Sequence, residues 1–355
     1  MRQQHRPFLL TTDTDLLDDL LGAAAAVGAA VDVGVEPAAC RPQWTDAPLV
    51  LLGSDLVGAA LAAHLWSRPD VLLVTRGAPT PELRHAAGRL GVEGTIALPN
   101  GESALLERLA DVVEPPARPA EVVAVVAGRG GAGASALAAG LALTAAAQGA
   151  PAWLIDLDAL GGGADAGLGA EMSTGVRWAD LDALTGRLSP RTLRSALADV
   201  LGVAVLAADG RPGSEPASEA VRAVIAAASR GPGTVVLDLP RHRTTARDAA
   251  LAMADDILVV VPGELRAVLA ARRVIEGLSG GSASPRAIVR IVPSGLPGRE
   301  VAQALQLSLA GELADELQVR TALQLGDASA IVRGTALATL CETLLDERQS
   351  LRVAA

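Results

Sequence analysis

The chain contains no lysine: all 30 of its basic residues are arginines, and they stand against 40 acidic residues for a net charge of −10. This absence excludes Schiff-base catalysis and every phosphate site that depends on a lysine ammonium group. Aromatic side chains are almost as rare, at 1% of the 355 residues, with no tyrosine. Modules that stack nucleic-acid bases on exposed aromatics are therefore disfavoured, and the acidic balance offers no general attraction to DNA or anionic lipid.

Cysteine is also scarce. Cys40 and Cys341 stand alone, outside any CxxC pattern, which disfavours a structural metal and indicates a reducing compartment such as the cytoplasm. No run reaches the roughly 18 to 20 apolar residues of a membrane-spanning helix. Half of the residues are hydrophobic, so the chain can bury large cores, and its length predicts two domains.

A proline-rich segment, residues 114–120, separates two series of strand-like runs, and proline and its neighbours favour extended backbone there. We therefore predict domains at residues 1–113 and 121–355 with a linker between them. In the first domain, short apolar runs alternate with helical patterns, which is typical of a parallel sheet with helices on both faces. The five predicted strands are Phe8–Leu10, Val31–Val35, Leu49–Leu52, Val71–Val74 and Thr95–Leu98.

This first domain resembles a response-regulator receiver. Asp13 and Asp15 follow the first strand, where receivers carry metal-binding acids. The third strand ends in Leu52–Ser54, with Asp55 as the nearest acid, and Leu98-Pro99 stands where receivers have Lys-Pro. We predict a receiver-like domain that is not phosphorylated; in the alternative interpretation, Asp13 and Asp15 only cap a helix.

The second domain opens with an apolar run, Val122–Ala127, a glycine-rich turn, and a helical stretch, Ala136–Ala147. A buried strand, a glycine turn and a helix N-terminus form an anion site, because backbone N–H groups and the helix dipole face the ligand. The predicted nucleotide-binding residues of this turn are Gly128, Arg129, Gly130, Gly131, Ala132, Gly133, Ala134 and Ser135.

Two motifs fit this turn. Gly128, Gly133 and Ser135 match the phosphate-loop pattern G-x-x-x-x-G-K-[ST], but Ala134 stands at the lysine position. The spacing of Gly128, Gly130 and Gly133 also fits the dinucleotide fingerprint, with Asp156 about 20 residues further on. A dinucleotide-dependent oxidoreductase is therefore an alternative from another class, and a purely structural glycine turn is a third interpretation.

Residues beyond the turn favour the phosphate loop. Asp156 and Asp158 end the next strand-like run, and Asp238 ends a later one. Together with the turn they resemble the MinD/ParA branch of P-loop ATPases over residues 121–345. The resemblance implies that loop N–H groups hold phosphates, Ser135 and Asp238 hold Mg2+, Asp158 positions the attacking water and Asp156 supports the switch.

Arg129 stands where that family has its signature lysine, which reaches across a nucleotide-sandwich homodimer. The sequence Arg129–Ser135, together with a receiver-like domain, resembles the CpaE/TadZ subgroup. Gly161–Gly163, Leu168–Glu171 and Gly175–Leu181 further resemble septum-site-determining, CpaE-like proteins of high-GC bacteria. The resemblance implies a regulator of division-site placement or of Tad-type pilus and secretion machinery, recruited to the septum or pole at the inner face of the membrane.

The eroded loop lowers the expected activity. Ala134 cannot bridge phosphates, and loss of such a preorganised charge costs about 100-fold to 1000-fold in rate. We expect weak ATP and Mg2+ binding at best, with Arg129 and Arg290 as remaining cations, and a role carried by partner binding. The alternative is a slow ATPase whose dimerisation is switched by Mg-ATP through Arg129.

The remaining arginines are interpreted as surface charges. Arg241–Arg243 follows the strand of Asp238, where a second switch would touch phosphate, but a solvated loop is the favoured interpretation. Arg272 and Arg273 form a solvent-facing pair rather than a DNA-binding patch. The C-terminal helix, near Thr335–Leu345, lacks a basic amphipathic face. Neither direct DNA binding nor an intrinsic membrane anchor is predicted.

Overall fold

The computed structural model describes residues 6–113, 119–181, 188, 190–207, 215–278 and 283–354. Two compact units make up the chain, Met1–Ala117 and Arg118–Ala355. Residues 114–118 of the predicted linker lie outside the described part. Within the described residues, no helix is both long enough and apolar enough to cross a membrane.

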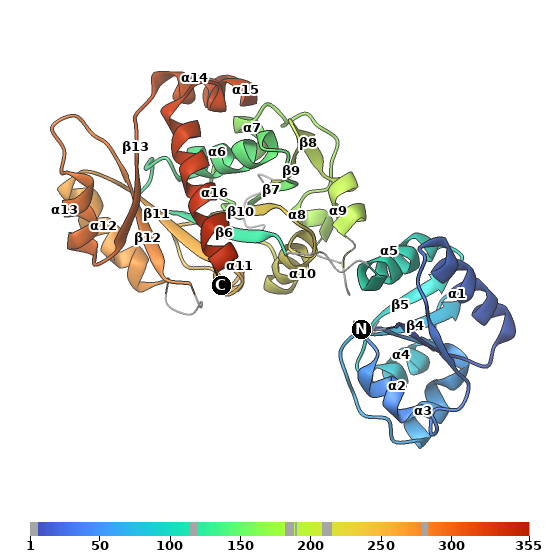
Figure 1. Ribbon diagram of the computed structural model, residues 1–355. Coiled ribbons are helices and arrows are strands. Elements are labelled where there is room, and N and C mark those ends of the chain that lie inside the picture. Colours follow the sequence, from blue (N-terminus) through green and yellow to red (C-terminus); the bar gives the residue numbers. More distant parts are fainter. Residues whose placement is uncertain are drawn as a thin grey trace. The chain divides into compact units, whose positions relative to one another are not determined.

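The N-terminal unit is a five-stranded parallel sheet between two helix layers (Figure 1), as predicted. Its strands follow the order β2-β1-β3-β4-β5, and alternate residues along them point to opposite faces. Leu10 and Leu52 pack with α2, α3 and α4, while Leu9 and Leu51 pack with α1 and α5. The elements are β1 (Phe8–Leu10), α1 (Thr14–Ala26), β2 (Asp32–Gly34), α2 (Arg41–Asp46), β3 (Val50–Gly53), η1 (Ser54–Leu56), α3 (Val57–Ala62), β4 (Val71–Arg76), α4 (Pro81–Gly88), β5 (Val92–Leu98) and α5 (Glu102–Val113).

The three acids singled out in this unit make structural contacts. The Asp13 carboxylate caps α1 by accepting the Leu16 N–H at 3.1 Å, which confirms the capping interpretation for that residue. Asp15 lies inside the first turn of α1 and does not cap it, contrary to the capping interpretation; its carboxylate forms an ion pair with Arg76 at 3.0 Å. Asp55 accepts hydrogen bonds from Thr11 Oγ1 at 2.8 Å and from the backbone N–H of Thr12 at 2.7 Å. Burial raises the pKa of Asp55, but the hydrogen bonds from Thr12 and Thr11 outweigh it and hold the pKa below its ordinary value.

The C-terminal unit contains an eight-stranded sheet in the order β13-β12-β11-β6-β10-β7-β9-β8, parallel except for the β8–β9 pair. The strands are β6 (Glu121–Ala127), β7 (Ala152–Asp156), β8 (Ala198–Val200), β9 (Val203–Leu206), β10 (Thr234–Leu239), β11 (Asp256–Pro262), β12 (Pro285–Arg290) and β13 (Ser308–Leu313). The helices are α6 (Ala134–Ala147), α7 (Ala164–Gly167), α8 (Trp178–Leu181), α9 (Pro190–Ala196), α10 (Ser218–Ala228), α11 (Thr245–Leu251), α12 (Leu265–Glu276), α13 (Gly298–Leu305), α14 (Leu317–Leu325), α15 (Ala328–Val332) and α16 (Ala336–Ala354).

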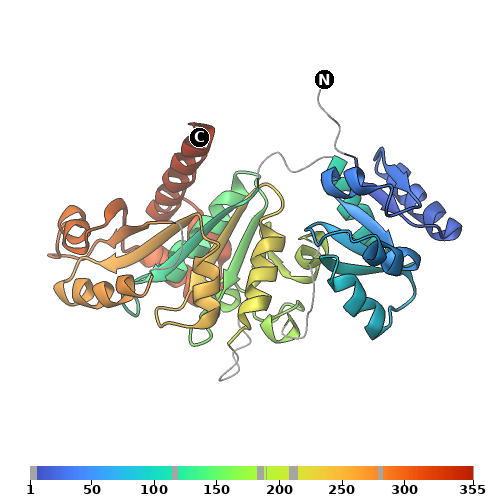
Figure 2. The same cartoon turned by 90° about the horizontal axis from the view of Figure 1, so that it is seen from below.

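Helices cover both faces of this sheet. Val122 and Val126 of β6 point to a core formed with α10 to α13, and Val123 and Val125 point to a core formed with α6 and α16. Figure 2 shows α10 and α11 on the opposite side of the strands from α16. α6 is rich in alanine because it is enclosed between the sheet and α16. A Cβ at Gly140 would lie 3.0 Å from Leu337 and 3.1 Å from the Cys341 sulfur, so a larger residue there would require these side chains to shift.

Strand register assembles the candidate site. Asp238 of β10 lies opposite Asp156 of β7 on one side and Val125 of β6 on the other. The carboxyl ends of parallel strands lie at one edge of a sheet, which is where ligands bind in open α/β folds. The turn after β6 and the acids of β7 and β10 therefore meet at this edge.

Candidate nucleotide-binding site

The turn between β6 and α6 depends on glycine at specific positions. Gly131 and Gly133 have φ angles of 71° and 101°, in the left-handed region that glycine adopts freely. A Cβ at Gly128 would lie 2.8 Å from the Cβ of Ala271 in α12, because the backbone of the turn lies close to this helix. Gly133 precedes α6 without a side-chain cap. The first N–H groups of the helix are thus left to meet an anion.

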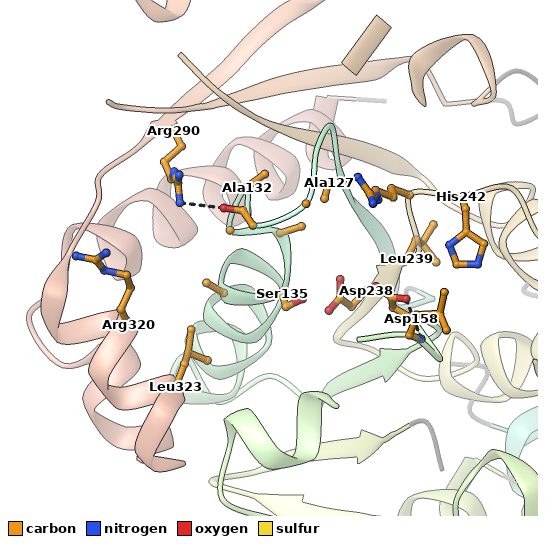
Figure 3. A pocket seen from close by; sticks show the side chains of 17 residues that line it. Ala127, Ala132, Ser135, Asp158, Asp238, Leu239, His242, Arg290, Arg320 and Leu323 are labelled. Atoms are coloured by element: carbon orange, nitrogen blue, oxygen red, sulfur yellow. Dashed lines mark hydrogen bonds between the residues drawn. The ribbon is translucent and has the colours of Figure 1, made fainter. Parts of the chain in front are cut away.

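A cavity of about 640 Å³ opens in front of this turn. Residues 130–136 form one wall, Asp158 and Asp238 another, and α14 contributes Arg320 and Leu323. In Figure 3, Arg290 and Arg320 lie at one end, His242 lies at the other, and the Ser135 side chain faces Asp238 between them. The cavity combines backbone donors, a hydroxyl, two carboxylates and cationic side chains, which is a set suited to a phosphate ligand with a cation.

The two acids at the strand ends have raised pKa values. Burial, with the nearby Asp156 charge as the next cause, raises the pKa of Asp238 to about 8, although the Ser135 hydroxyl hydrogen-bonds to its carboxylate. Burial also raises the pKa of Asp156 to about 6, against hydrogen bonds from the backbone N–H groups of Asp158 and Ala164. Those bonds measure 2.9 and 2.8 Å. Asp156 thereby shapes the loop that presents Asp158 to the cavity.

We expect the metal-free chain to lose stability as the pH rises towards 8. The native pKa of Asp238, about 8, exceeds its ordinary value of 3.8, so the folded state holds a proton that the unfolded state releases. The stabilisation is complete below about pH 4 and is lost as the pH rises to about 8. Urea unfolding between about pH 5 and 8 in the presence of EDTA measures this slope.

Asp238→Asn is the control for this prediction, because it keeps the size of the side chain and cannot ionise. The slope of the unfolding free energy against pH should be flatter in this variant than in the wild-type chain. Equal slopes in the two proteins would show that Asp238 is ionised in the folded state at neutral pH, contrary to the prediction.

The cations next to the turn have different partners. Arg129 Nη1 donates to Glu264 Oε2 at 2.5 Å, and Arg129 is not among the residues that line the cavity. Arg290 Nη1 donates to the Gly131 carbonyl at 3.1 Å. Arg241 and His242 line the cavity, whereas Arg243 pairs with Asp248 at 2.9 Å and lies outside it.

Comparison with known proteins places the chain in a family. Residues 10–120 match a family model described as the Rv3660c-like, CheY-like N-terminal domain. Over 322 residues the chain is 37% identical to the uncharacterized protein Rv3660c of Mycobacterium tuberculosis (strain ATCC 25618 / H37Rv). The aligned region covers 89% of this chain and 90% of that protein. The chain belongs to the Rv3660c-like family.

Solved structures show the fold of the second part of this Rv3660c-like protein. A ParA family ATPase from Chlorobium tepidum TLS has a TM-score of 0.55 at 16% identity, covering 64% of this chain and 97% of that one. The septum site-determining protein MinD from Pyrococcus horikoshii OT3, complexed with Mg-ADP, has a TM-score of 0.51 at 15% identity, covering 66% and 97%. The predicted pairing of a receiver-like domain with a MinD/ParA-like fold is confirmed.

In this Rv3660c-like chain the structure gathers most of the residues singled out in the sequence. Gly130, Gly131, Ala132, Gly133, Ala134 and Ser135 line the cavity with Asp158 and Asp238. Gly128, Arg129 and Asp156 lie beside it, with packing, ion-pair and loop-shaping contacts. Arg320 was not singled out in the sequence, because an arginine on an amphipathic helix carries no local sign of the cavity that it borders.

Proposed function

We propose that the chain is a MinD/ParA-like spatial regulator with an eroded ATP site, acting mainly through partner binding. Its organisation would be a receiver-like domain (1–113), a linker (114–120) and a MinD/ParA-like domain (121–355). The observation that carries the proposal is the composition of the cavity. The phosphate turn, Ser135, Asp158 and Asp238 share one cavity, while Ala134 offers no charge at the lysine position. Nucleotide binding would then persist in weak form, with very slow hydrolysis.

The donor set at the strand ends fits Mg2+. This ion prefers oxygen ligands and is held by one or two protein groups together with substrate phosphates. Ser135 and Asp238 supply a hydroxyl and a carboxylate that face each other in the cavity. They would hold Mg2+ beside the phosphates, while Asp158 would orient water for hydrolysis. Among the described residues, no cluster of three or more His, Cys, Asp or Glu side chains could hold a metal by itself.

Calorimetric titration of the full chain with Mg-ATP tests this proposal. We expect a dissociation constant of about 0.1 mM, or about −5.5 kcal/mol, and turnover close to the uncatalysed background. Asp158→Ala should leave binding within about twofold, because the residue acts on water rather than on phosphate. Tight binding of NADH in place of ATP would overturn the proposal and support the oxidoreductase.

A second candidate is the slow ATPase switched by dimerisation, and the place of Asp158 in the cavity wall favours it. Arg129 would have to leave Glu264 to reach the phosphates of a second copy. Sedimentation with and without Mg-ATP separates the candidates. A homodimer that forms only with nucleotide and is lost in Arg129→Ala, together with turnover abolished in Asp158→Ala, would establish the switch.

The cellular role proposed is placement of the division septum or positioning of Tad-type pilus and secretion machinery. The segment that resembles septum-site-determining proteins contains α7 and α8, and Trp178 of α8 donates to the Asp156 carbonyl beside the cavity. The protein would be cytoplasmic and would be recruited by such partners to the septum or pole. A fluorescent fusion of the full chain tests this role: uniform fluorescence throughout the cell cycle would contradict it.

A further inference from the structure

A phosphate turn without its lysine is short of one cation, and the structure allows a search for a replacement. Arg129 is paired with Glu264, and Arg290 donates to a carbonyl of the turn itself. Arg320 lies 3.5 Å from Asp315. Each of these guanidinium groups would have to give up or share a contact before it could meet a phosphate.

The side chain of Arg241 differs from these three in its contacts. It follows β10 two residues after Leu239 and lines the same cavity as Ser135 and Asp238. A Cβ built at Gly130 would lie 3.7 Å from Arg241 Nη1, so the guanidinium reaches the phosphate turn. Within the described part of the chain, this guanidinium has neither an ion pair nor a hydrogen-bond acceptor.

The backbone of Arg241 is held in place by a hydrogen bond from α11. Arg247 of α11 is 1% exposed, and its Nη1 donates to the Arg241 carbonyl at 2.9 Å. The Thr244 hydroxyl caps the same helix by accepting the Arg247 N–H at 2.9 Å. A buried guanidinium is costly unless it is hydrogen-bonded, and here one of its bonds fixes the segment that carries Arg241. The exposed side chain therefore starts from a set position beside the turn.

We propose that Arg241 supplies the phosphate-binding charge that the turn lost at Ala134. This inference rests on the proposed nucleotide site and names the residue that sustains its affinity. The terminal phosphates of a nucleoside triphosphate lying on the turn would receive two N–H groups from this guanidinium, a geometry that arginine provides and lysine does not. The cation thus comes from the segment after β10 rather than from the first turn of α6.

Arg243 provides a matched control. It belongs to the same segment, but its side chain is 72% exposed, pairs with Asp248 and lies outside the cavity wall. In calorimetric titrations of the full chain, Arg241→Ala should weaken Mg-ATP binding about 10-fold to 100-fold, the range for a hydrogen bond to a charged group. Mg-ADP should lose less, because it lacks the terminal phosphate. Arg243→Ala should stay within about twofold of wild type.

A rescue experiment separates direct replacement from a general effect of charge. Adding Ala134→Lys to the Arg241→Ala variant should restore its affinity for Mg-ATP. The same substitution in the wild-type chain should raise the affinity by a smaller factor, since the two cations would bind one phosphate. Equal losses in Arg241→Ala and Arg243→Ala would overturn the inference. Unchanged Mg-ATP binding in Arg241→Ala would also overturn the inference. The melting temperature of this variant shows whether it is folded.

The inference and the proposed function can fail separately. If the wild-type chain binds no Mg-ATP up to millimolar concentrations but Ala134→Lys does, the turn is intact and Arg241 does not replace the lysine. If neither chain binds, the nucleotide site itself is refuted, and the role of Arg241 with it.

Discussion

Replacing Asp256 by alanine should lower the free energy of unfolding of the C-terminal unit by about 3–5 kcal/mol, the usual cost of removing one partner from a buried ion pair. Asp256, 3% exposed, opens β11 and accepts two hydrogen bonds from Arg286, the shorter at 2.6 Å. Arg348 of α16 lies 3.7 Å from the same carboxylate and also pairs with Glu121 at the start of β6. The substitution would leave two half-buried guanidinium groups without their shared acid.

The same contacts attach the end of α16 to the sheet. Burial lowers the pKa of Arg286, but the Asp256 hydrogen bonds and the Glu347 charge outweigh it and hold the pKa above its ordinary value. Urea unfolding of the full chain measures the loss, and hydrogen exchange of α16 peptides locates it. Glu347→Ala is the control, because Glu347 is half exposed and 3.5 Å from Arg286, and it should cost less than about 1 kcal/mol. A similar cost for both variants would contradict the prediction.

Trp178→Ala should lower the unfolding free energy by about 3–5 kcal/mol, the range for removing a large aromatic side chain from a core. Trp178 is 1% exposed and belongs to the core that α10 to α13 form with the sheet. Its indole N–H also donates to the Asp156 carbonyl at 2.7 Å, at the end of β7. The loss therefore combines a cavity with a broken hydrogen bond beside the acids of the site. Urea unfolding measures it.

Trp178→Phe separates these two causes. It keeps most of the apolar volume but removes the N–H donor and part of the indole ring, so about 1–3 kcal/mol is expected, the cost of one unsatisfied buried group. If Trp178→Ala lowered the unfolding free energy no more than Trp178→Phe does, the prediction that packing of the indole ring stabilises this segment would be wrong.

Regular packing made much of the fold predictable. In the N-terminal unit, apolar runs at Phe8–Leu10 and Val71–Val74 became β1 and β4, because strands buried on both faces must be apolar throughout. The fifth strand begins at Val92 rather than Thr95. Glu93 and Gly94 interrupt the apolar pattern there, so the local sequence did not indicate a strand.

The C-terminal helix has contacts that its local sequence does not indicate. It was expected near Thr335–Leu345 with a continuation into Asp346–Arg348, and it runs from Ala336 to Ala354. Nothing in the sequence around Glu347 and Arg348 points to a partner, yet both residues pair with residues of the sheet. A charged residue whose partner lies far away in the sequence, here 227 positions for Arg348 and Glu121, gives no periodic signal, so its burial cannot be predicted from its neighbours.

The sequence by itself determined the two parallel α/β units, the glycine turn after β6 and the alanine at the lysine position of the phosphate-loop pattern, because glycine spacing and apolar runs depend on nearby residues alone. Only the tertiary structure decided which arginines meet the turn. Arg129, inside the motif, is paired with Glu264, whereas Arg241, read as part of a solvated loop, lines the cavity without a partner among the described residues. Side-chain charges act through space, and the register of β6, β7 and β10 sets their distances.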